Sequence, residues 1–215
     1  MKAPTVTIID YGLGNLLSVQ RGFEYFNAKV TITSDPKVIL ASQRVVLPGV
    51  GAFPQGMKSL NDLGLVPTIK ELALRGTPIL AICLGMQLLM DEGDEFEITT
   101  GLGLIPGRAV AIPKRSKKGN LQKVPHIGWN SLIPTHRESS WESTLLEDNV
   151  SGDFMYFVHS YMAVPNMEEN RLADTFYIDQ RIPSVVSREN ITGCQFHPEK
   201  SGIQGLKILR SFISK

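Results

Sequence analysis

The most informative segment reads Pro78-Ile79-Leu80-Ala81-Ile82-Cys83-Leu84-Gly85-Met86-Gln87-Leu88-Leu89. An apolar run typical of a buried parallel strand leads into Cys83, and a helix-forming stretch follows at once. This pattern predicts a nucleophile elbow, a sharp turn that presents the Cys83 sulfur at the carboxyl end of a sheet. The amino terminus of the following helix would stabilise a thiolate. The alternative is a buried structural cysteine, the commoner role of a cysteine after an apolar strand.

A short apolar run followed by helical periodicity also recurs upstream of this segment. Apolar runs at residues 5–9, 30–33 and 45–47 predict strands that are buried on both faces. Residues 16–26 and the pair Asp35-Pro36 predict helices between these strands. Alternating strands and helices predict an α/β fold with a three-layer, doubly wound, mostly parallel sheet.

The pattern changes from about residue 105 onward. Segments at residues 108–112, 153–161, 172–178 and 191–196 are separated by turn residues, and they predict further strands, several of them antiparallel, added to the sheet. The last residues predict a closing helix, with Ser201 as its cap. We expect residues 1–215 to form a single domain, since this length suits one compact α/β unit.

Composition and charge exclude several classes of protein. With 42% hydrophobic residues the chain is a typical globular protein, and 22 Lys and Arg against 21 Asp and Glu leave no global field to attract nucleic acid or a membrane surface. One basic run, residues 114–118, predicts an exposed loop or, alternatively, a docking surface. Two cysteines without disulfide-framework spacing, no signal-peptide core and no long apolar run predict a cytoplasmic protein.

A second informative segment, Gln195-Phe196-His197-Pro198-Glu199, also follows a strand-like run. A thiol nucleophile needs a base within hydrogen-bond reach, and that base needs an acceptor that orients it. His197 and Glu199 supply both groups at the end of one strand. By itself the motif is weak evidence because surface His and Glu are common, but together with Cys83 it predicts a catalytic triad.

A third segment, Leu47-Pro48-Gly49-Val50-Gly51, again follows a predicted strand. A tetrahedral intermediate on a cysteine carries an oxyanion, which backbone N–H groups must approach closely, and glycine permits that approach. Taken in isolation, Gly49 and Gly51 predict only an ordinary turn.

The elbow, the glycine loop and the His-x-Glu motif occur in this order in the class I (triad) glutamine amidotransferases, which the sequence therefore resembles. The resemblance implies a flavodoxin-like fold, no cofactor, and attack of a cysteine on the side-chain amide of glutamine with release of ammonia. It assigns the triad to Cys83, His197 and Glu199, and the oxyanion hole to Val50, Gly51 and Leu84.

Three further segments narrow the resemblance, over nearly the whole chain, to the glutaminase subunits of imidazole glycerol phosphate synthases. These are Asp10-Tyr11-Gly12-Leu13-Gly14-Asn15-Leu16, Pro125-His126-Ile127-Gly128-Trp129-Asn130 and Tyr156-Phe157-Val158-His159-Ser160-Tyr161. The resemblance implies glutamine contacts at Gly49, Gln87, Glu95, His159, Ser160 and Tyr161. It also implies a heterodimer with a (βα)8-barrel synthase subunit of histidine biosynthesis, which Asn15, Trp129, Asn130, Tyr156 and Lys200 would face.

Two alternative functions remain open. A related amidotransferase subunit could supply ammonia to a sugar-modifying synthase in surface-polysaccharide synthesis, or the chain could be a non-catalytic regulatory subunit on the same fold. No metal is expected, because His126 and His136 have no partners at metal-ligand spacing. The turn at residues 12–15 lacks the spacing of a dinucleotide loop, so no nicotinamide cofactor is expected either.

Overall fold

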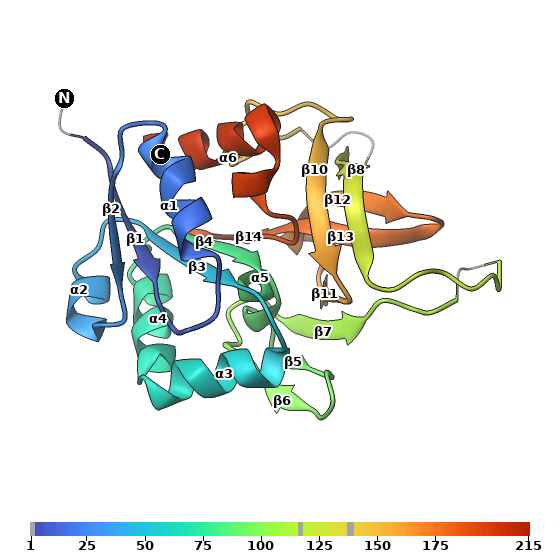
Figure 1. Ribbon diagram of the computed structural model, residues 1–215, viewed down its shortest axis with the longest axis horizontal. Helices are drawn as coiled ribbons and strands as arrows, with labels where there is room; N and C mark the ends of the chain where they lie inside the picture. The colour runs from blue at the N-terminus through green and yellow to red at the C-terminus, as the bar shows by residue number, and fades with distance from the viewer. Residues whose placement is uncertain (1–2, 116–117, 137–139) are drawn as a thin grey trace.

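The computed structural model describes residues 3–115, 118–136 and 140–215, and its centre is an eight-stranded sheet (Figure 1). The strand order is β2-β1-β3-β4-β14-β13-β12-β9. The first five strands in this order are parallel, and the last three are added antiparallel. Their bounds are β1 Thr5–Ile9, β2 Lys29–Thr33, β3 Val45–Gly49, β4 Ile79–Cys83, β9 Ile133–Pro134, β12 Arg171–Tyr177, β13 Gln180–Arg188 and β14 Ile191–Cys194.

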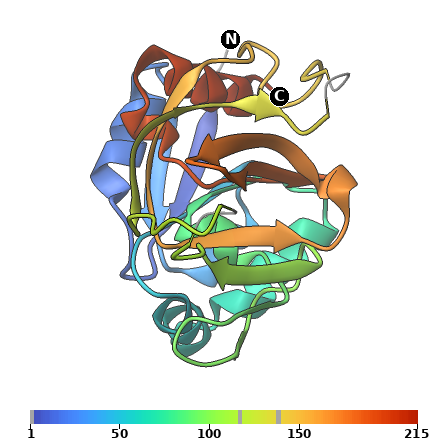
Figure 2. The ribbon, with the colours of Figure 1, turned by 90° about the vertical axis from the view of Figure 1, so that its right-hand side faces the viewer.

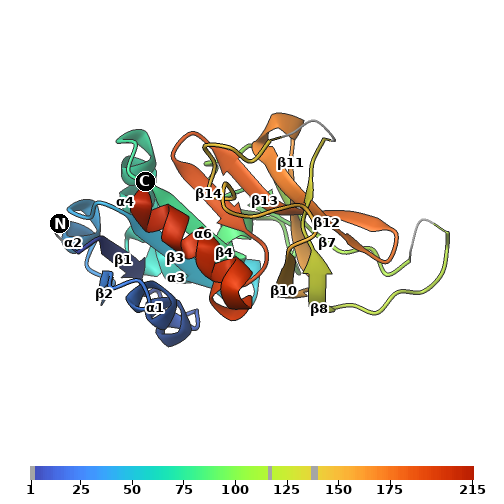
Figure 3. The same cartoon turned by 90° about the horizontal axis from the view of Figure 1, so that it is seen from above.

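Helices cover both faces of this sheet, which makes three layers. The helices α1 and α6 lie side by side on one face, and α2, α3, α4 and α5 lie on the other (Figures 1 and 3). Each face has its own buried hydrophobic cluster, and β1, β3, β4 and β14 are buried as their apolar runs require. The prediction that residues 30–33 form a strand buried on both faces is wrong, because β2 lies at the edge of the sheet and none of its residues is buried. The helices are α1 Leu16–Glu24, α2 Pro36–Leu40, α3 Phe53–Asp62, α4 Leu65–Leu74, α5 Leu84–Leu88 and α6 Gly202–Ser214.

Two smaller sheets lie beside the antiparallel end of the central sheet, on the side that faces the viewer in Figure 2. One is the antiparallel pair β8 (His126–Ser131) and β10 (Phe154–His159). The other has the order β11-β7-β5-β6, with bounds Tyr161–Pro165, Gly107–Ala111, Glu92–Gly93 and Thr99–Thr100. Single 3-10 turns at Glu168–Asn170 (η1) and Pro198–Lys200 (η2) complete the chain.

The doubly wound α/β fold expected from the sequence is confirmed, and two details differ. Residues 153–161 form not one strand but the end of β10 and the start of β11, which separate at Ser160 and enter different sheets. Likewise, β7 joins a smaller sheet and not the central one. The physical reason is that a period-2 pattern identifies a strand but not the partner with which it pairs.

Ser201 is the N-cap residue of α6, as expected, but its side chain forms no capping hydrogen bond with that helix. Its hydroxyl donates to the carbonyl of His197 at 2.6 Å and accepts from the backbone N–H of Tyr156 at 3.0 Å. These bonds hold η2 against β10, and η2 follows directly after His197. Within the described ranges, no helix combines the length and apolar character needed to cross a membrane.

Candidate active site

Cys83 is the last residue of β4, the fourth strand of the central sheet, and α5 begins at the next residue. Its backbone has φ 54° and ψ −110°, a region that a residue with a side chain rarely adopts. Such strain typically costs about 1–3 kcal/mol and persists where the surrounding structure enforces it. The strained strand-to-helix turn predicted from residues 78–89 is therefore present.

Gly85 is what allows α5 to begin so close to β3. A Cβ atom on Gly85 would lie 2.0 Å from the backbone oxygen of Leu47, which cannot move without displacing β3. We expect Gly85→Ala to lower the free energy of unfolding by about 3 kcal/mol or more, measured by denaturant titration. The matched control is Gly56→Ala in α3, where the new methyl meets only the tips of leucine side chains at 3.1–3.3 Å.

For Gly56→Ala, we expect a change within about 1 kcal/mol, since alanine also favours the helix. Equal losses in the two variants would contradict the close approach of α5 and β3.

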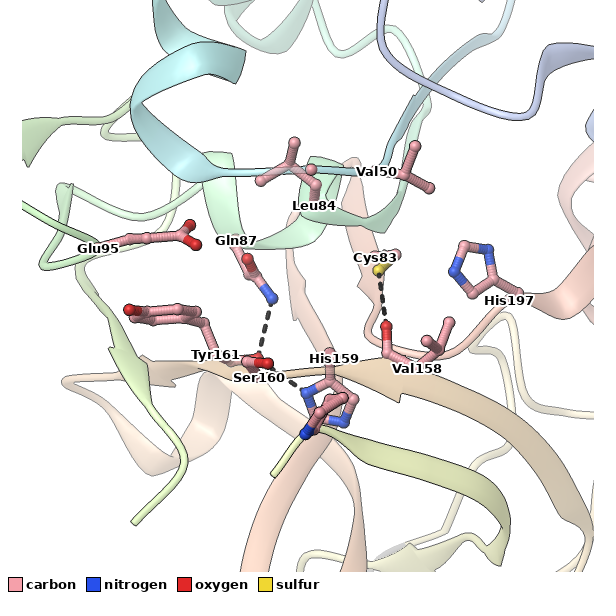
Figure 4. Close-up of a pocket in the computed structure, with 12 residues that line it drawn as sticks. Val50, Cys83, Leu84, Gln87, Glu95, Val158, His159, Ser160, Tyr161 and His197 are labelled. Atoms are coloured by element: carbon pink, nitrogen blue, oxygen red, sulfur yellow. Dashed lines mark hydrogen bonds between the residues drawn. The ribbon is translucent and has the colours of Figure 1, made fainter. Parts of the chain in front are cut away.

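His197 and Glu199 are joined by a buried hydrogen bond. The Nδ1 of His197 lies 2.8 Å from Oε1 of Glu199, and the two side chains are only 3% and 1% exposed. The other ring nitrogen, Nε2, is buried and forms no hydrogen bond within the described part of the chain. In Figure 4 the His197 ring lies beside the sulfur of Cys83, so its unpartnered nitrogen belongs to the same pocket as the thiol.

Burial lowers the pKa of His197, but Cys83 and the hydrogen-bonded Glu199 outweigh it and raise that pKa to about 10. The folded state therefore binds this proton more tightly than the unfolded chain, whose histidine titrates near 6.5. The resulting stability is complete below pH 6.5 and is lost as the pH rises to about 10.

We expect the free energy of unfolding to fall more steeply across this pH window in the wild-type chain than in His197→Gln, measured by denaturant unfolding. Parallel curves for the two proteins would rule out a raised pKa at His197.

The glycine loop follows β3 and lies next to the elbow. Gly49 is buried, and a Cβ at its position would meet the hydroxyl of Tyr11 at 2.3 Å and Cβ of Leu84 at 2.9 Å. Gly51 has φ 110°, which favours glycine, and both Val50 and Gly51 line the pocket above Cys83. Gly49 is not among the described residues that line this pocket, and its contact with a substrate stays a prediction.

The pocket in front of Cys83 has a volume of about 340 Å³, within the usual range of small-molecule sites. Most of the side chains expected at the site meet here, although they come from distant parts of the sequence (Figure 4). The predicted residues that line the pocket are Val50, Gly51, Cys83, Leu84, Gln87, Glu95, His159, Ser160, Tyr161 and His197.

One buried residue that the sequence analysis did not single out contacts the thiol. Gln195 is fully buried, its Nε2 lies 3.8 Å from Sγ of Cys83, and its Oε1 accepts from Nε2 of Gln87 at 3.2 Å. The same Gln87 nitrogen donates to the carbonyl of Tyr161 at 2.9 Å. Gln195 lies just beyond the end of β14 and two residues before His197, and this alternate position in an extended segment is the signal that could have found it.

Glu95 lines the pocket, and it also holds a helix. Its Oε2 accepts from the backbone N–H of Phe53 at 2.7 Å, at the first residue of α3. A carboxylate in this position satisfies a free N–H group and complements the helix dipole. Glu95 therefore links the pocket to α3, and its contact with a substrate remains a prediction.

Three of the residues expected to face a partner lie on β8 and β10, and the other two lie at the start of α1 and in η2. Trp129 is 53% exposed and packs against Tyr156 with ring centroids 5.8 Å apart, so it is not part of the buried core. Asn130 is half-buried on the same strand. Asn15 caps α1 through a 3.3 Å bond from Ser18 N–H, and Lys200 is exposed just beyond the triad segment.

The remaining titratable candidates lie elsewhere. Cys194 is fully buried, and burial raises the pKa of its thiol, as expected of a small core residue. Among the described residues, no group of three or more His, Cys, Asp or Glu side chains is arranged to hold a metal ion. The basic run at residues 114–118 is exposed where the structure describes it, and residues 116–117 lie outside the described ranges.

Comparison with known proteins identifies the family. The family model described as "Glutamine amidotransferase class-I" matches residues 7–215. The chain belongs to the class-I glutamine amidotransferases. This class-I amidotransferase is 49% identical, over 97% of its length and 98% of the relative's, to imidazole glycerol phosphate synthase subunit HisH 1 of Legionella pneumophila strain Lens.

Other relatives carry the same subunit name. The HisH subunit of Geobacillus sp. strain WCH70 is 46% identical over 97% of the amidotransferase chain and 96% of its own, and that of Geobacter sulfurreducens is 42% identical over 96% and 97%. Solved structures agree on the fold: PurLQS from Thermotoga maritima has a TM-score of 0.71 at 18% identity, over 99% of both chains. The amidotransferase is therefore close to the HisH subunits.

Proposed function

We infer that this chain is the glutaminase subunit of an imidazole glycerol phosphate synthase, with Cys83 as nucleophile. The observation that carries the proposal is that Cys83 and His197 line the same pocket, and that Nδ1 of His197 lies 2.8 Å from Oε1 of Glu199. A nucleophile, a base and an orienting acceptor are the three parts that cysteine-dependent amide hydrolysis needs. The identity of 42–49% to HisH subunits supports the histidine pathway over a sugar-modifying synthase.

The first half-reaction breaks the amide C–N bond of glutamine. The Cys83 thiolate attacks the side-chain carbonyl carbon, and protonated His197 gives its proton to the leaving nitrogen, so that ammonia departs and a glutamyl thioester remains. The backbone N–H groups near Gly51 and Leu84 stabilise the oxyanion of the tetrahedral intermediate. The raised pKa of His197 keeps its proton available for the leaving group.

The second half-reaction hydrolyses the thioester. His197 is neutral after the first step and accepts a proton from water as the water attacks the thioester carbon. The C–S bond then breaks, which releases glutamate and restores the Cys83 thiolate. Nε2 of Gln195, 3.8 Å from Sγ, is in place to donate to the Cys83 thiolate both before the first step and after the thioester is hydrolysed.

The glutamine itself would lie along the wall that Gln87, Glu95 and Tyr161 form. Amides, hydroxyls and a carboxylate suit the charged amino and carboxylate groups of an amino acid. The exposed surface around Trp129 on β8 is where a (βα)8-barrel, HisF-like synthase subunit would bind, and the ammonia would pass to it. An exposed Trp beside a Tyr has the composition of an interface centre.

The test of the proposed function uses the purified chain and a HisF-type subunit. Ammonia release from glutamine is measured for the chain alone, for the mixture, and for the mixture with the nucleotide substrate of the synthase. We expect release to be nearly silent in the chain alone and to rise strongly in the full mixture. Equal rates in all three would contradict a partner-dependent glutaminase, and no release in any of them would contradict the proposed activity.

A further inference from the structure

A continuous line of hydrogen bonds runs from the β8 surface to the thiol of the pocket. It begins at Asn130, whose Nδ2 donates to the carbonyl of Phe176 at 2.8 Å and whose Oδ1 lies 2.8 Å from Nε2 of His126. The Nδ1 of His126 lies 3.0 Å from Nε2 of His159, and Nδ1 of His159 lies 2.8 Å from the carbonyl of Tyr161. Phe176 is 50% exposed, so this end of the line reaches the surface.

From Tyr161 the line continues to Cys83 through two amides. The carbonyl of Tyr161 also accepts from Gln87, which donates to Gln195, which in turn donates to the Cys83 sulfur. Figure 4 shows the Gln87 and His159 bonds converging on the Tyr161 carbonyl from two sides. The position of this carbonyl therefore depends on the proton carried by Nδ1 of His159.

The two histidines cannot satisfy all these contacts in their neutral forms. The Tyr161 carbonyl only accepts, so it requires a proton on Nδ1 of His159. The Oδ1 of Asn130 also only accepts, and the bond from Nδ2 to Phe176 fixes the amide that way round, so Nε2 of His126 must carry a proton. Nδ1 of His126 and Nε2 of His159, which face each other at 3.0 Å, then both carry a lone pair and no proton. A hydrogen bond between them needs a third proton.

The surroundings of the pair oppose that third proton. His126 is fully buried between the rings of Phe157 and Tyr177, with centroids 4.8 and 4.1 Å away, and His159 is 6% exposed. Burial lowers the pKa of both rings. Burial together with the neighbouring His126 and His197 outweighs the hydrogen bond to Tyr161 and lowers the pKa of His159 to about 3. The phenol of Tyr177 donates to the Lys123 carbonyl at 2.6 Å and supplies no counter-charge.

We propose that the His126–His159 pair is neutral, so that its two ring protons can form only two of its three hydrogen bonds. The place of the missing hydrogen bond, called the gap below, couples the β8 surface to the glutamine pocket. If His126 carries its proton on Nδ1, the gap lies at Asn130 and the Tyr161 carbonyl stays bound. If His126 carries it on Nε2, His159 donates through its own Nε2, because two lone pairs that face each other at 3.0 Å repel, and the gap lies at Tyr161. His126 and Asn130 are thus positioning residues for the pocket, and a partner group that bonds Asn130 or Phe176 selects between the two states. This inference rests on the proposed function for its consequence, not for its geometry.

Two substitutions at Asn130 give opposite expectations for the protonation of His159, which the Tyr161 carbonyl and two amide side chains separate from the thiol. In Asn130→Ala the acceptor is gone, so His126 is free to donate through Nδ1, and Nε2 of His159 stays unprotonated. In Asn130→Asp the carboxylate keeps a proton on Nε2 of His126, so a proton appears on Nε2 of His159. Both variants lose the bond to Phe176, so that loss cancels in the comparison.

The readout is ¹⁵N–¹H NMR of the histidine rings in the full-length chain without substrate, with His159 assigned by the loss of its signals in His159→Gln. We expect Nε2 of His159 to be mainly unprotonated in Asn130→Ala and mainly protonated in Asn130→Asp. The same state in both variants would overturn the proposal, as would three ring protons on the wild-type pair at neutral pH. The wild-type measurement stands even where a variant does not fold.

A second readout is the KM for glutamine in the complex with the synthase subunit. We expect KM in Asn130→Asp to exceed that in Asn130→Ala by up to about tenfold, the equivalent of one hydrogen bond at the pocket. The NMR result needs no turnover, so the two ideas fail separately. If the His159 tautomer differs between the two Asn130 variants but the chain has no glutaminase activity, only the proposed function is contradicted. If the tautomer is the same in both variants of an active chain, only the coupling is contradicted.

Discussion

Cys83→Ala is expected to abolish ammonia release from glutamine, by at least about a thousandfold, while the chain still folds. Removal of the nucleophile of a hydrolase leaves only the catalysis that binding and oxyanion stabilisation provide. Alanine keeps the Cβ atom, so the strain at φ 54° is unchanged, and the sulfur forms only long contacts of 3.8 and 3.9 Å. The measurement is glutaminase activity in the partner complex, with circular dichroism as the check on folding.

The matched control is Cys194→Ala, which removes the other buried cysteine at the end of the neighbouring strand β14. This variant loses some packing energy but keeps its turnover. An electrophilic glutamine analogue is also expected to add its mass to Cys83 and not to Cys194. Turnover that survives Cys83→Ala would refute the mechanism, and an unlabelled Cys83 would favour the non-catalytic alternative.

Glu199→Gln is expected to lower glutaminase turnover by up to about 10⁴-fold with little change in fold. In serine hydrolases the equivalent loss of charge, by Asp to Asn, leaves the geometry intact but leaves the imidazole in the wrong tautomer. Here the 2.8 Å bond from His197 would meet an amide in place of a carboxylate, and the pKa of His197 would fall because a buried charge that raises it is gone. Steady-state kinetics and an NMR titration of His197 measure the two effects.

A surface pair offers the control for Glu199→Gln. Glu168 lies 3.9 Å from His136, and both side chains are 57% exposed, so solvent screens their interaction. Glu168→Gln is expected to leave both turnover and stability unchanged. A loss of turnover below tenfold in Glu199→Gln would show that Glu199 does not orient the base.

Much of the fold and of the site follows from local sequence signals. An apolar run followed by a residue pair such as Asp35-Pro36 identifies a strand and a helix start, and Asp35 does cap α2. Cys83, His197 and Glu199 could be found because Cys83 ends β4 and the other two follow shortly after β14, and parallel topology brings the ends of these neighbouring strands to one edge. The sequence therefore predicts most of the side chains that line the pocket of Figure 4.

What the sequence did not predict depends on long-range pairing. No local sequence pattern indicates that residues 153–161 are divided between two sheets. None indicates either that the Ser201 hydroxyl donates to the carbonyl of His197 and forms no capping hydrogen bond with α6. The same holds for His126, which reads as a lone histidine but lies fully buried against His159. Its proposed role depends on counting the protons shared by His126, Asn130, His159 and the Tyr161 carbonyl, which come together only in the folded chain.

The separation of the central sheet from the β8–β10 ribbon has an evolutionary consequence. The thiol stands on β4, in the middle of the main sheet, whereas β8 pairs only with β10 among the described strands. Mutations of exposed side chains on this ribbon, such as Trp129, can accumulate without disturbing β4, the strand that carries the nucleophile. A lineage can thus exchange the recipient of its ammonia while it inherits the machinery that liberates it.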